Sequence, residues 1–364
     1  MSIEPAHKHP HPQEPHQSAA QGHDPVAQGA PPPHVAMFQI MNGMWVTQVA
    51  SAVAQLGVAD FIAAGTRHAD RLAEECGADA DALVRLLRAA AAIGLCRETA
   101  PKEFALTPVG ETLRTQAPGS MRDILIAETA PGHWLPWGRL VDSVREGKPM
   151  TNETLGMPAW DYYAKNSGEG QCFARGMSNL SAIASHDVAA VYNAGQARTI
   201  VDVGGSEGVL LRGLLRNAPP DTRGVLFDRP EIMDFARAAI TASDLAGRIE
   251  LAAGDFFVDV PSGGDVYLLK SILHDWPDAA CETILRNIHR AAAPGSRVVI
   301  VEMVLPDEPQ PSPVALMDMN MLVMLGGRER TSGEYRALLA KCGFELERVV
   351  PTQGMFAVLE AKRV

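Results

Sequence analysis

The stretch RTIVDVGGSEG, residues 198–208, decides the fold of this chain. Its apolar run is typical of a buried strand, and the strand ends in glycines. The next segment, VLLRGLLRNAP at residues 209–219, has its leucines at helical spacing. A strand, a glycine turn and a helix in this order form the first unit of an open sheet covered by helices.

The same alternation continues to the C-terminus. Strands are predicted at residues 223–228, 248–255, 264–271 and 296–304, with helical segments at 231–243 and 279–293 between them. Apolar strands that alternate with helices predict a parallel sheet. The last two strands, 344–350 and 355–363, are too close for a crossover helix and should pair antiparallel. The predicted fold class is therefore α/β: a Rossmann-like, doubly wound sheet with an antiparallel last strand.

Residues 35–148 have a different, mostly helical pattern. Two short helices meet near Gly77, and a short extended pair and another helix follow, which is the order of a winged helix. Gene regulation is one interpretation, but Asp79 and Asp81 open the would-be recognition helix and would face phosphates. The apolar helix from Phe38 to Ala54 favours a dimerisation role instead. We divide the chain into a tail (1–34), this winged-helix-like domain (35–148) and a catalytic domain (149–364).

The bulk composition excludes several classes of protein. The net charge of −11 over 364 residues argues against binding to nucleic acid or to an anionic membrane. No apolar run approaches the roughly 18 residues of a membrane span. The five cysteines lack CxxC spacing, which favours a reducing cytoplasm and argues against a disulfide framework or a zinc site. Six of the 11 histidines lie in the tail, where disorder is expected and any metal affinity is incidental.

The strand ends carry the predicted chemistry, because ligands of such sheets lie across the carboxyl ends of the strands. The glycines after the first strand let a ligand approach the backbone. Asp228, which ends the second strand, is placed for two ribose hydroxyls. Asp255 can accept from an adenine amino group, and Phe256 can pack on its ring. GGSEG differs from the GxGxxG of dinucleotide sites, which favours S-adenosylmethionine over NAD or FAD.

Several motifs together resemble a known family. DVGGSEG, LFDRPEI, GDFF, LLKSILHDWPD, VEMV and GGRERT are similar, in order and spacing, to motifs of the caffeic-acid-type S-adenosylmethionine-dependent O-methyltransferases of plants and bacterial natural-product pathways. The resemblance implies an intertwined homodimer, a small aromatic or polyketide-like acceptor, and S-adenosylhomocysteine as product. It assigns residues to three roles. Cofactor contacts are Ser181, Gly204, Asp228, Asp255, Phe256 and Lys270. His274 is the general base, and Glu302 and Glu329 orient it. The acceptor pocket is lined by Phe173, Met177, Asn320 and Met324.

The histidine of LHDWPD then has a chemical purpose. A phenol has a pKa near 10 and needs deprotonation to attack a methyl group. A histidine at a strand end can take that proton, and a carboxylate can fix its tautomer. Asp275 directly follows His274 and is expected to point elsewhere, which leaves Glu302 and Glu329 as the orienting acids. No metal constellation is evident in the sequence.

The chain departs from the family pattern at Ser206 and Glu207, where a third glycine is usual, and at Arg229. Three functions remain open at this point. The first is O-methylation of a phenolic or enolic natural product. The second keeps the scaffold and cofactor but performs decarboxylation, hydroxylation or a pericyclic reaction. The third is a winged-helix regulator.

Overall fold

The computed structural model describes residues 31–364. The histidine-rich segment 1–30 lies outside the described residues, and so does most of the tail predicted at 1–34. The first helix, α1 (Pro33–Met41), already begins within the last residues of that predicted tail. The contacts within the chain divide it into two units, Met1–Trp45 and Val46–Val364.

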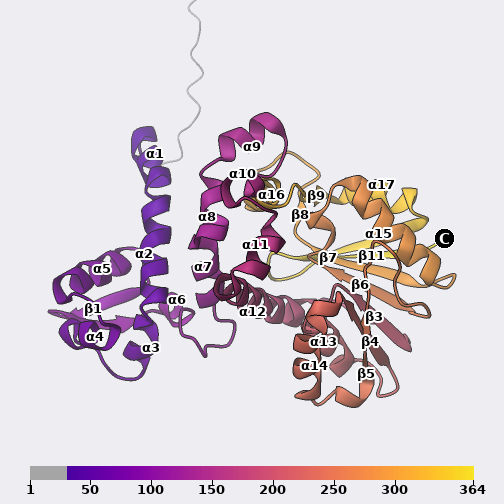
Figure 1. Cartoon of the computed structure of the whole chain (residues 1–364), viewed down its shortest axis with the longest axis horizontal. Helices are drawn as coiled ribbons and strands as arrows, with labels where there is room; N and C mark the ends of the chain where they lie inside the picture. The colour runs from indigo at the N-terminus through magenta and orange to yellow at the C-terminus, as the bar shows by residue number, and fades with distance from the viewer. Residues whose placement is uncertain (1–30) are drawn as a thin grey trace, which may run out of the picture. The chain divides into compact units, whose positions relative to one another are not determined.

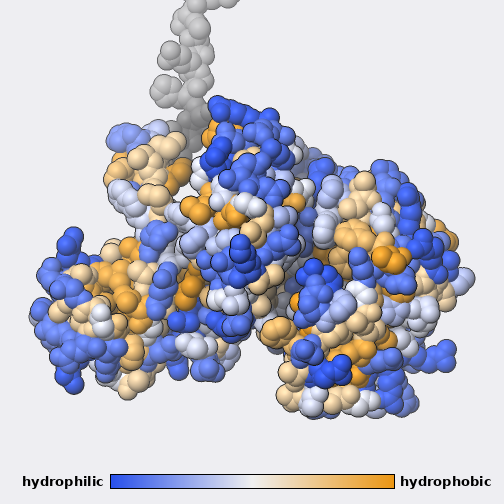
Figure 2. All heavy atoms as spheres, viewed as in Figure 1, coloured by the Kyte–Doolittle hydropathy of each residue, from blue (hydrophilic) through white to orange (hydrophobic). Residues whose placement is uncertain are grey.

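The helix α1 presents an apolar surface. None of its nine residues is buried, and Met37, Phe38, Ile40 and Met41 are between 53% and 72% exposed. Figure 2 shows this apolar surface over α1. An exposed apolar helix of this kind is a typical protein-interaction surface.

The second unit begins with the helices and the small wing expected from the sequence. The two short helices flank Gly77, and Asp79 caps the second of them by accepting a hydrogen bond from the backbone N–H of Ala82 at 2.9 Å. Asp79 thus has a structural role in the helix start. The elements up to residue 111 are α2 (Gly43–Gln55), α3 (Val58–Ala63), α4 (Ala69–Cys76), α5 (Ala80–Ala92), the antiparallel pair β1 (Cys96–Ala100) and β2 (Glu103–Leu106), and α6 (Pro108–Glu111).

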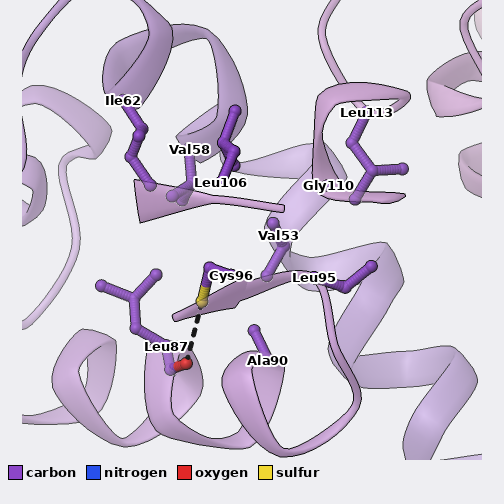
Figure 3. A pocket seen from close by; sticks show the side chains of 10 residues that line it. All are labelled: Val53, Val58, Ile62, Leu87, Ala90, Leu95, Cys96, Leu106, Gly110 and Leu113. Atoms are coloured by element: carbon purple, nitrogen blue, oxygen red, sulfur yellow. Dashed lines mark hydrogen bonds between the residues drawn. The ribbon is translucent and has the colours of Figure 1, made fainter. Parts of the chain in front are cut away.

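The wing closes over an apolar core (Figure 3). Cys96 lies at its centre and donates a hydrogen bond from its thiol to the carbonyl of Leu87 at 3.3 Å. The space left between the side chains is about 10 Å³, which is the room of one water molecule at most. Because its lining is apolar, this space is a packing defect of the core and no ligand site.

Six helices connect the wing to the sheet. The longest, α12, has 25 residues and packs closely on α7, where a Cβ on Gly176 would meet the backbone of Ile124 at 2.6 Å. The helices are α7 (Arg122–Thr129), α8 (Pro131–Trp137), α9 (Leu140–Glu146), α10 (Thr151–Leu155), α11 (Ala159–Lys165) and α12 (Ser167–Val191).

The sheet has seven strands in the order β10-β11-β7-β6-β3-β4-β5. The five strands β3 to β7 are parallel, β11 pairs antiparallel with β7, and β10 pairs antiparallel with β11, so the predicted fold class is confirmed. The strand order reverses between β3 and β6. The strands are β3 (Thr199–Val203), β4 (Arg223–Asp228), β5 (Ile249–Ala253), β6 (Val266–Lys270), β7 (Arg297–Glu302), β10 (Phe344–Pro351) and β11 (Ala357–Arg363).

Helices cover both faces of the sheet (Figure 1). One apolar core lies between the sheet and α12, α13 (Val209–Asn217) and α14 (Met233–Thr241). The other lies between the sheet and α15 (Asp278–Ala291) and α17 (Ser332–Lys341). The strand bodies are apolar because both faces are buried in this way, whereas the strand ends are free to carry polar groups.

One small feature escaped prediction. β8 (Val304–Leu305) and β9 (Arg330–Thr331) form a parallel two-stranded ladder, separated in sequence by α16 (Val314–Met324). Strands of two residues have no periodicity that a sequence could reveal. Among residues 31–364, no helix is both long and apolar enough to cross a membrane.

Candidate active site

The strand ends predicted to carry chemistry meet at the point where the strand order reverses. Gly204 directly follows β3, and Lys270 ends β6, the neighbouring strand in the sheet. A crevice between such strands is where ligands of doubly wound sheets bind. Two loops form this edge: the glycine loop, residues 204–208 after β3, and the base loop, residues 271–277 after β6.

The glycine loop leaves no room for side chains at its first two positions. A Cβ on Gly205 would lie 2.3 Å from Leu226 and 2.6 Å from the carboxylate of Asp202, and Gly204 has a φ of 72°. Ser206, where the resembling family has a glycine, also adopts a left-handed φ of 52°. Ser206 therefore keeps the backbone conformation that a glycine would favour. A residue with a side chain adopts this conformation only with backbone strain.

Asp228 lies at the end of β4 and faces the glycine loop. Its two carboxylate oxygens accept the backbone N–H groups of Ser206 at 2.8 Å and Arg229 at 2.7 Å. Burial raises the pKa of this carboxyl, and the two N–H groups oppose that rise. Each oxygen keeps a second lone pair, so the carboxylate can still accept from a pair of hydroxyls.

Asp255 and Phe256 follow β5 at the same edge. Asp255 is exposed and accepts the backbone N–H of Phe257 at 2.8 Å. Phe256 packs against Phe257 and Trp276, with ring centroids 4.9 and 6.3 Å away. Trp276 therefore joins the base loop to the end of β5.

A buried pair of opposite charges lies beneath the glycine loop. Asp202 is 2% exposed, and burial raises its pKa to about 7 although Lys270 opposes this. Burial lowers the pKa of Lys270, while Glu302 and Asp202 oppose that change. The ammonium group of Lys270 lies 3.3 Å from the hydroxyl of Ser271. The sequence placed Lys270 and Asp202 on strand ends but did not reveal their electrostatic coupling.

Glu302, the last residue of β7, holds the base loop by its backbone. One of its carboxylate oxygens accepts the N–H groups of Ile272 at 3.0 Å, Leu273 at 2.9 Å and His274 at 3.4 Å. The other oxygen is buried and lies 3.6 Å from Nδ1 of His274. Glu302 therefore acts on His274 mainly by fixing the loop that carries it.

The ring of His274 is surrounded by carboxylates. Its Nδ1 hydrogen-bonds to Glu329 at 2.8 Å, and its Nε2 lies 3.4 Å from the carboxylate of Asp275. The expectation that Asp275 points elsewhere is therefore wrong. Residues 273–275 form a single 3-10 turn, which leaves the consecutive side chains of His274 and Asp275 near each other.

Burial and the neighbouring charges alter the titration of His274, Glu302 and Asp275. Burial by itself would lower the pKa of His274, but Glu302, Asp275 and Glu329 outweigh it and raise the pKa to about 10. Burial raises the pKa of Glu302 to about 7, although His274 opposes that rise. Burial likewise raises the pKa of Asp275 to about 6. The cluster therefore has a high affinity for one proton.

Glu329 is positioned by neighbours that the sequence analysis missed. Its backbone N–H donates to Asp318 at 2.8 Å. Arg330, which is 1% exposed, donates to the carbonyls of Leu273 at 3.0 Å and Trp276 at 2.9 Å. The motif GGRERT was recognised, but nothing in its spacing shows that the arginine reaches back into the base loop. Only the sheet brings the two segments together.

A Cβ on Gly327 would lie 1.9 Å from the carbonyl oxygen of His274. The chain can lie against the base loop at Gly327 only because this residue has no side chain. The backbone N–H of Arg328 donates a hydrogen bond to the same carbonyl at 2.8 Å. The ligand atoms of His274, Glu302 and Glu329 lie within 4.8 Å of one another, a geometry that could also hold a metal ion.

The predicted acceptor contacts lie on two helices. Phe173 and Met177 are on α12, as is the half-buried Ser181, and Phe173 stacks on Tyr163 at 4.8 Å. Met324 is 4% exposed and packs with Val323 in a small apolar cluster.

Asn320 lies on the wall of an open cavity of about 560 Å³, a size suited to a small-molecule ligand. The lining is mostly apolar and consists of Glu128, Trp137, Met303, Pro313, Val314, Leu316, Met317, Asn320, Gly354 and Met355. Met303 directly follows Glu302, so the cavity adjoins the segment that carries the acids around His274.

The strand-end residues fit S-adenosylmethionine. The glycine loop forms a cradle that a Cβ on Gly205 would fill, and Asp228 at its side has lone pairs free for two hydroxyls. Phe256 supplies an aromatic ring beside the exposed carboxylate of Asp255. These groups suit a nucleoside without a pyrophosphate, because the glycine loop has no basic side chain that would favour one.

Comparisons with known proteins agree with this site. The chain matches an O-methyltransferase domain at residues 137–345 and an O-methyltransferase dimerisation domain at residues 38–116. It is 36% identical over 336 residues to the phenazine O-methyltransferase PhzM of Lysobacter antibioticus, covering 92% of this chain and 98% of that protein. It is 39% identical over 315 residues to the 3-amino-4-hydroxybenzoate 4-O-methyltransferase of Streptomyces cremeus, covering 86% of each.

A solved structure is similar along almost its full length. The methyltransferase CalO1 of calicheamicin biosynthesis, in its S-adenosylhomocysteine-bound form, superposes with a TM-score of 0.81 at 31% identity, covering 91% of this chain and 98% of that one. Fold and comparisons thus define a methyltransferase with a Rossmann-like sheet. The chain belongs to the family of O-methyltransferases with an N-terminal dimerisation domain. It is an S-adenosylmethionine-dependent O-methyltransferase, and the regulatory and non-methylating alternatives are not favoured.

Proposed function

We propose that this enzyme methylates a phenolic or enolic hydroxyl of a small aromatic or polyketide-like natural product, with His274 as the general base. One observation carries the proposal: an imidazole whose Nδ1 is bonded to Glu329 sits in a loop next to the cofactor crevice. The named relatives act on aromatic hydroxyl compounds, which supports the same acceptor class here.

The proton of the acceptor hydroxyl moves to Nε2 of His274 in this proposal. Nδ1–H donates to Glu329, which fixes the tautomer and leaves Nε2 as the proton acceptor. The pKa of about 10 for His274 is close to that of a phenol, so this transfer is nearly balanced in energy. The carboxylates of Glu302, Asp275 and Glu329 then stabilise the imidazolium.

S-adenosylmethionine, when bound, supplies an electrophilic methyl group on a sulfonium. In this proposal Asp228, Asp255 and Phe256 would hold its nucleoside, Gly204 would leave room for it in the crevice, and Ser181 and Lys270 would supply the remaining contacts. The cavity beside Met303 admits the acceptor, and its apolar wall excludes water around an aromatic ring. Phe173, Met177, Asn320 and Met324 are the proposed acceptor contacts. The rest of the rate enhancement comes from aligning the acceptor oxygen with the methyl group.

We also propose that the enzyme is a homodimer located in the cytoplasm. The dimerisation-domain match and the exposed apolar surface of α1 support the dimer. The cysteines at residues 76, 96, 172, 281 and 342 are all free, which is in keeping with a reducing compartment. Light scattering at micromolar concentration should give twice the chain mass, and a monomer mass would contradict this assembly.

The activity is tested by incubating the enzyme with S-adenosylmethionine and a panel of phenols and enols. We expect a product heavier by one methyl group, formed in equal amount to S-adenosylhomocysteine, as measured by mass spectrometry. Conversion of an acceptor without S-adenosylhomocysteine would instead indicate chemistry other than methyl transfer.

A further inference from the structure

A cluster of four polar side chains joins the helices around the cavity. Glu128 comes from α7, His133 and Trp137 from α8, and Asn320 from α16. Three of them line the cavity, whereas His133 lies behind them and is 4% exposed. We call this set the cavity cluster. None of its members is part of the base loop.

The orientation of the Asn320 amide is fixed by its donors. Nε1 of Trp137 can only donate, so the atom that it meets at 2.8 Å must be the amide oxygen. Nε2 of His133 lies 2.8 Å from the same oxygen and must therefore carry a proton. Both lone pairs of this oxygen therefore accept hydrogen bonds. The amide nitrogen lies on the side of Met317, whose sulfur is 3.8 Å away. Asn320 thus offers the cavity a donor and no acceptor.

His133 supplies no second N–H to the cluster. Its Nδ1 is buried without a hydrogen-bond partner, and a proton on this atom would be an unsatisfied buried donor. The proton that this ring offers to the cluster is therefore the one on Nε2. That proton also faces the carboxylate of Glu128, 3.1 Å away.

Within the cavity cluster, His133 is the partner of Glu128, and it faces one of the two carboxylate oxygens. No lysine or arginine lines the cavity, and apart from Asn320 and Trp137 its other lining residues are apolar or glycine. Burial raises the pKa of Glu128, with His133 opposing that rise. The carboxylate is nevertheless 41% exposed and so remains accessible from the cavity. A carboxylate in this setting has unused acceptor capacity and gains most from a donor that carries positive charge or an N–H group.

We propose that Glu128 is a specificity-determining residue that selects acceptors bearing an amino group, while the Asn320 amide donates to an oxygen of the same molecule. This inference rests on the proposed function, because it assigns the substrate class of that site. An acceptor with a methyl group in place of the amino group would leave the carboxylate unpaired and is rejected for that reason.

The test measures binding to the enzyme saturated with S-adenosylhomocysteine, so that it does not depend on turnover. Calorimetry compares naphthols that carry an amino group with naphthols that carry a methyl group at the same position. We expect at least one naphthol with an amino group to bind ~10- to 100-fold more tightly than the naphthol with a methyl group at the same position. This is the range for a hydrogen bond to a charged group. Glu128→Gln should reduce that ratio, and Glu128→Leu should abolish or reverse it.

Glu169 provides the matched control. It is a carboxylate of the same helical region, but both its oxygens already accept bonds from within the chain, from Tyr162 at 3.1 Å and from the backbone of Gly132 at 3.0 Å. Glu169→Gln should keep the preference for amino members. Equal binding of all pairs by the wild-type enzyme, including undetectable binding of both members, overturns the inference, as does an unchanged ratio in Glu128→Leu. Methyl transfer to a naphthol, read separately by mass, decides the proposed function on its own.

Discussion

The glycine loop and the base loop follow neighbouring strands, yet they are held in opposite ways. The glycine loop is fixed by groups of the adjacent strand β4, namely the carbonyl of Phe227 and the carboxylate of Asp228, and it has no room for a side chain at Gly205. The base loop is fixed by buried side chains from distant segments, namely Glu302 and Arg330. Each loop contains one serine with a left-handed φ, Ser206 at 52° and Ser271 at 53°.

This difference matches the functions proposed for the two loops, which are cofactor binding and proton transfer. A loop that binds a cofactor must offer space and N–H groups, which glycines provide. A loop that carries a base must hold one ring to within a fraction of an ångström, which requires packing and charge. Substitutions at the base loop should therefore affect turnover, whereas substitutions at the glycine loop should affect cofactor binding.

The largest effect is expected at His274. His274→Gln should lower the turnover rate by ~10²–10⁴-fold, because the acceptor then loses its base. Cofactor affinity should stay nearly the same, since the ring is bonded to acids and not to the glycine loop. The rate of S-adenosylhomocysteine formation and calorimetry with the cofactor measure the two quantities. A mutant with full rate at neutral pH would show that His274 is not the base.

A smaller loss is expected at Gly327, which is far from His274 in sequence. Gly327→Ala places a Cβ 1.9 Å from the His274 carbonyl, and this backbone atom cannot rotate away. The shifted base loop should lower turnover by ~10²-fold, the size of effect that a small misplacement of a reacting group causes. Gly263→Ala is a control for glycine loss in general, since its Cβ would meet nothing within 4 Å. Its left-handed φ of 84° makes it a test of strain without a clash. Equal turnover in both variants would contradict the role of the close approach.

The converse prediction concerns Asp228. Asp228→Ala should weaken binding of S-adenosylmethionine by ~1.5–3 kcal/mol, the range for a hydrogen bond to a charged group. Turnover at saturating cofactor should change little. Asp234→Ala on α14 is a control, because this carboxylate is exposed and lies in the helix beyond that strand. Unchanged affinity in Asp228→Ala, measured by calorimetry, would remove this residue from the ribose site.

The smallest effect is a shift of the pH profile. The base must be unprotonated, and the pKa of about 10 for His274 means that activity rises with pH through the neutral range. Glu329→Gln removes one of the negative charges that raise this pKa. The pKa should therefore fall, and the ascending limb should move to lower pH, although the maximal rate drops because the ring is held less firmly.

Rates for both proteins are compared with the same acceptor, so that its own ionisation cancels. A limb that stays in place, or moves to higher pH, would show that Glu329 does not act on the proton affinity of His274.

The sequence by itself determined where the strands lie along the chain and which polar residues follow them. Apolar runs predicted all seven strands of the main sheet, and the first five of these runs end in glycine or an ionisable group. This was possible because local periodicity records which faces are buried. The family motifs added His274 and its acids, whose side chains the structure brings together.

The tertiary structure alone decided how those residues influence one another. Asp275 turns towards His274, Arg330 reaches the base loop, and Glu128 faces both His133 and the cavity. Each of these depends on contacts between segments far apart in sequence, or on the turn of a single loop. Charge coupling and burial are properties of distances in space, and a one-dimensional pattern does not contain them.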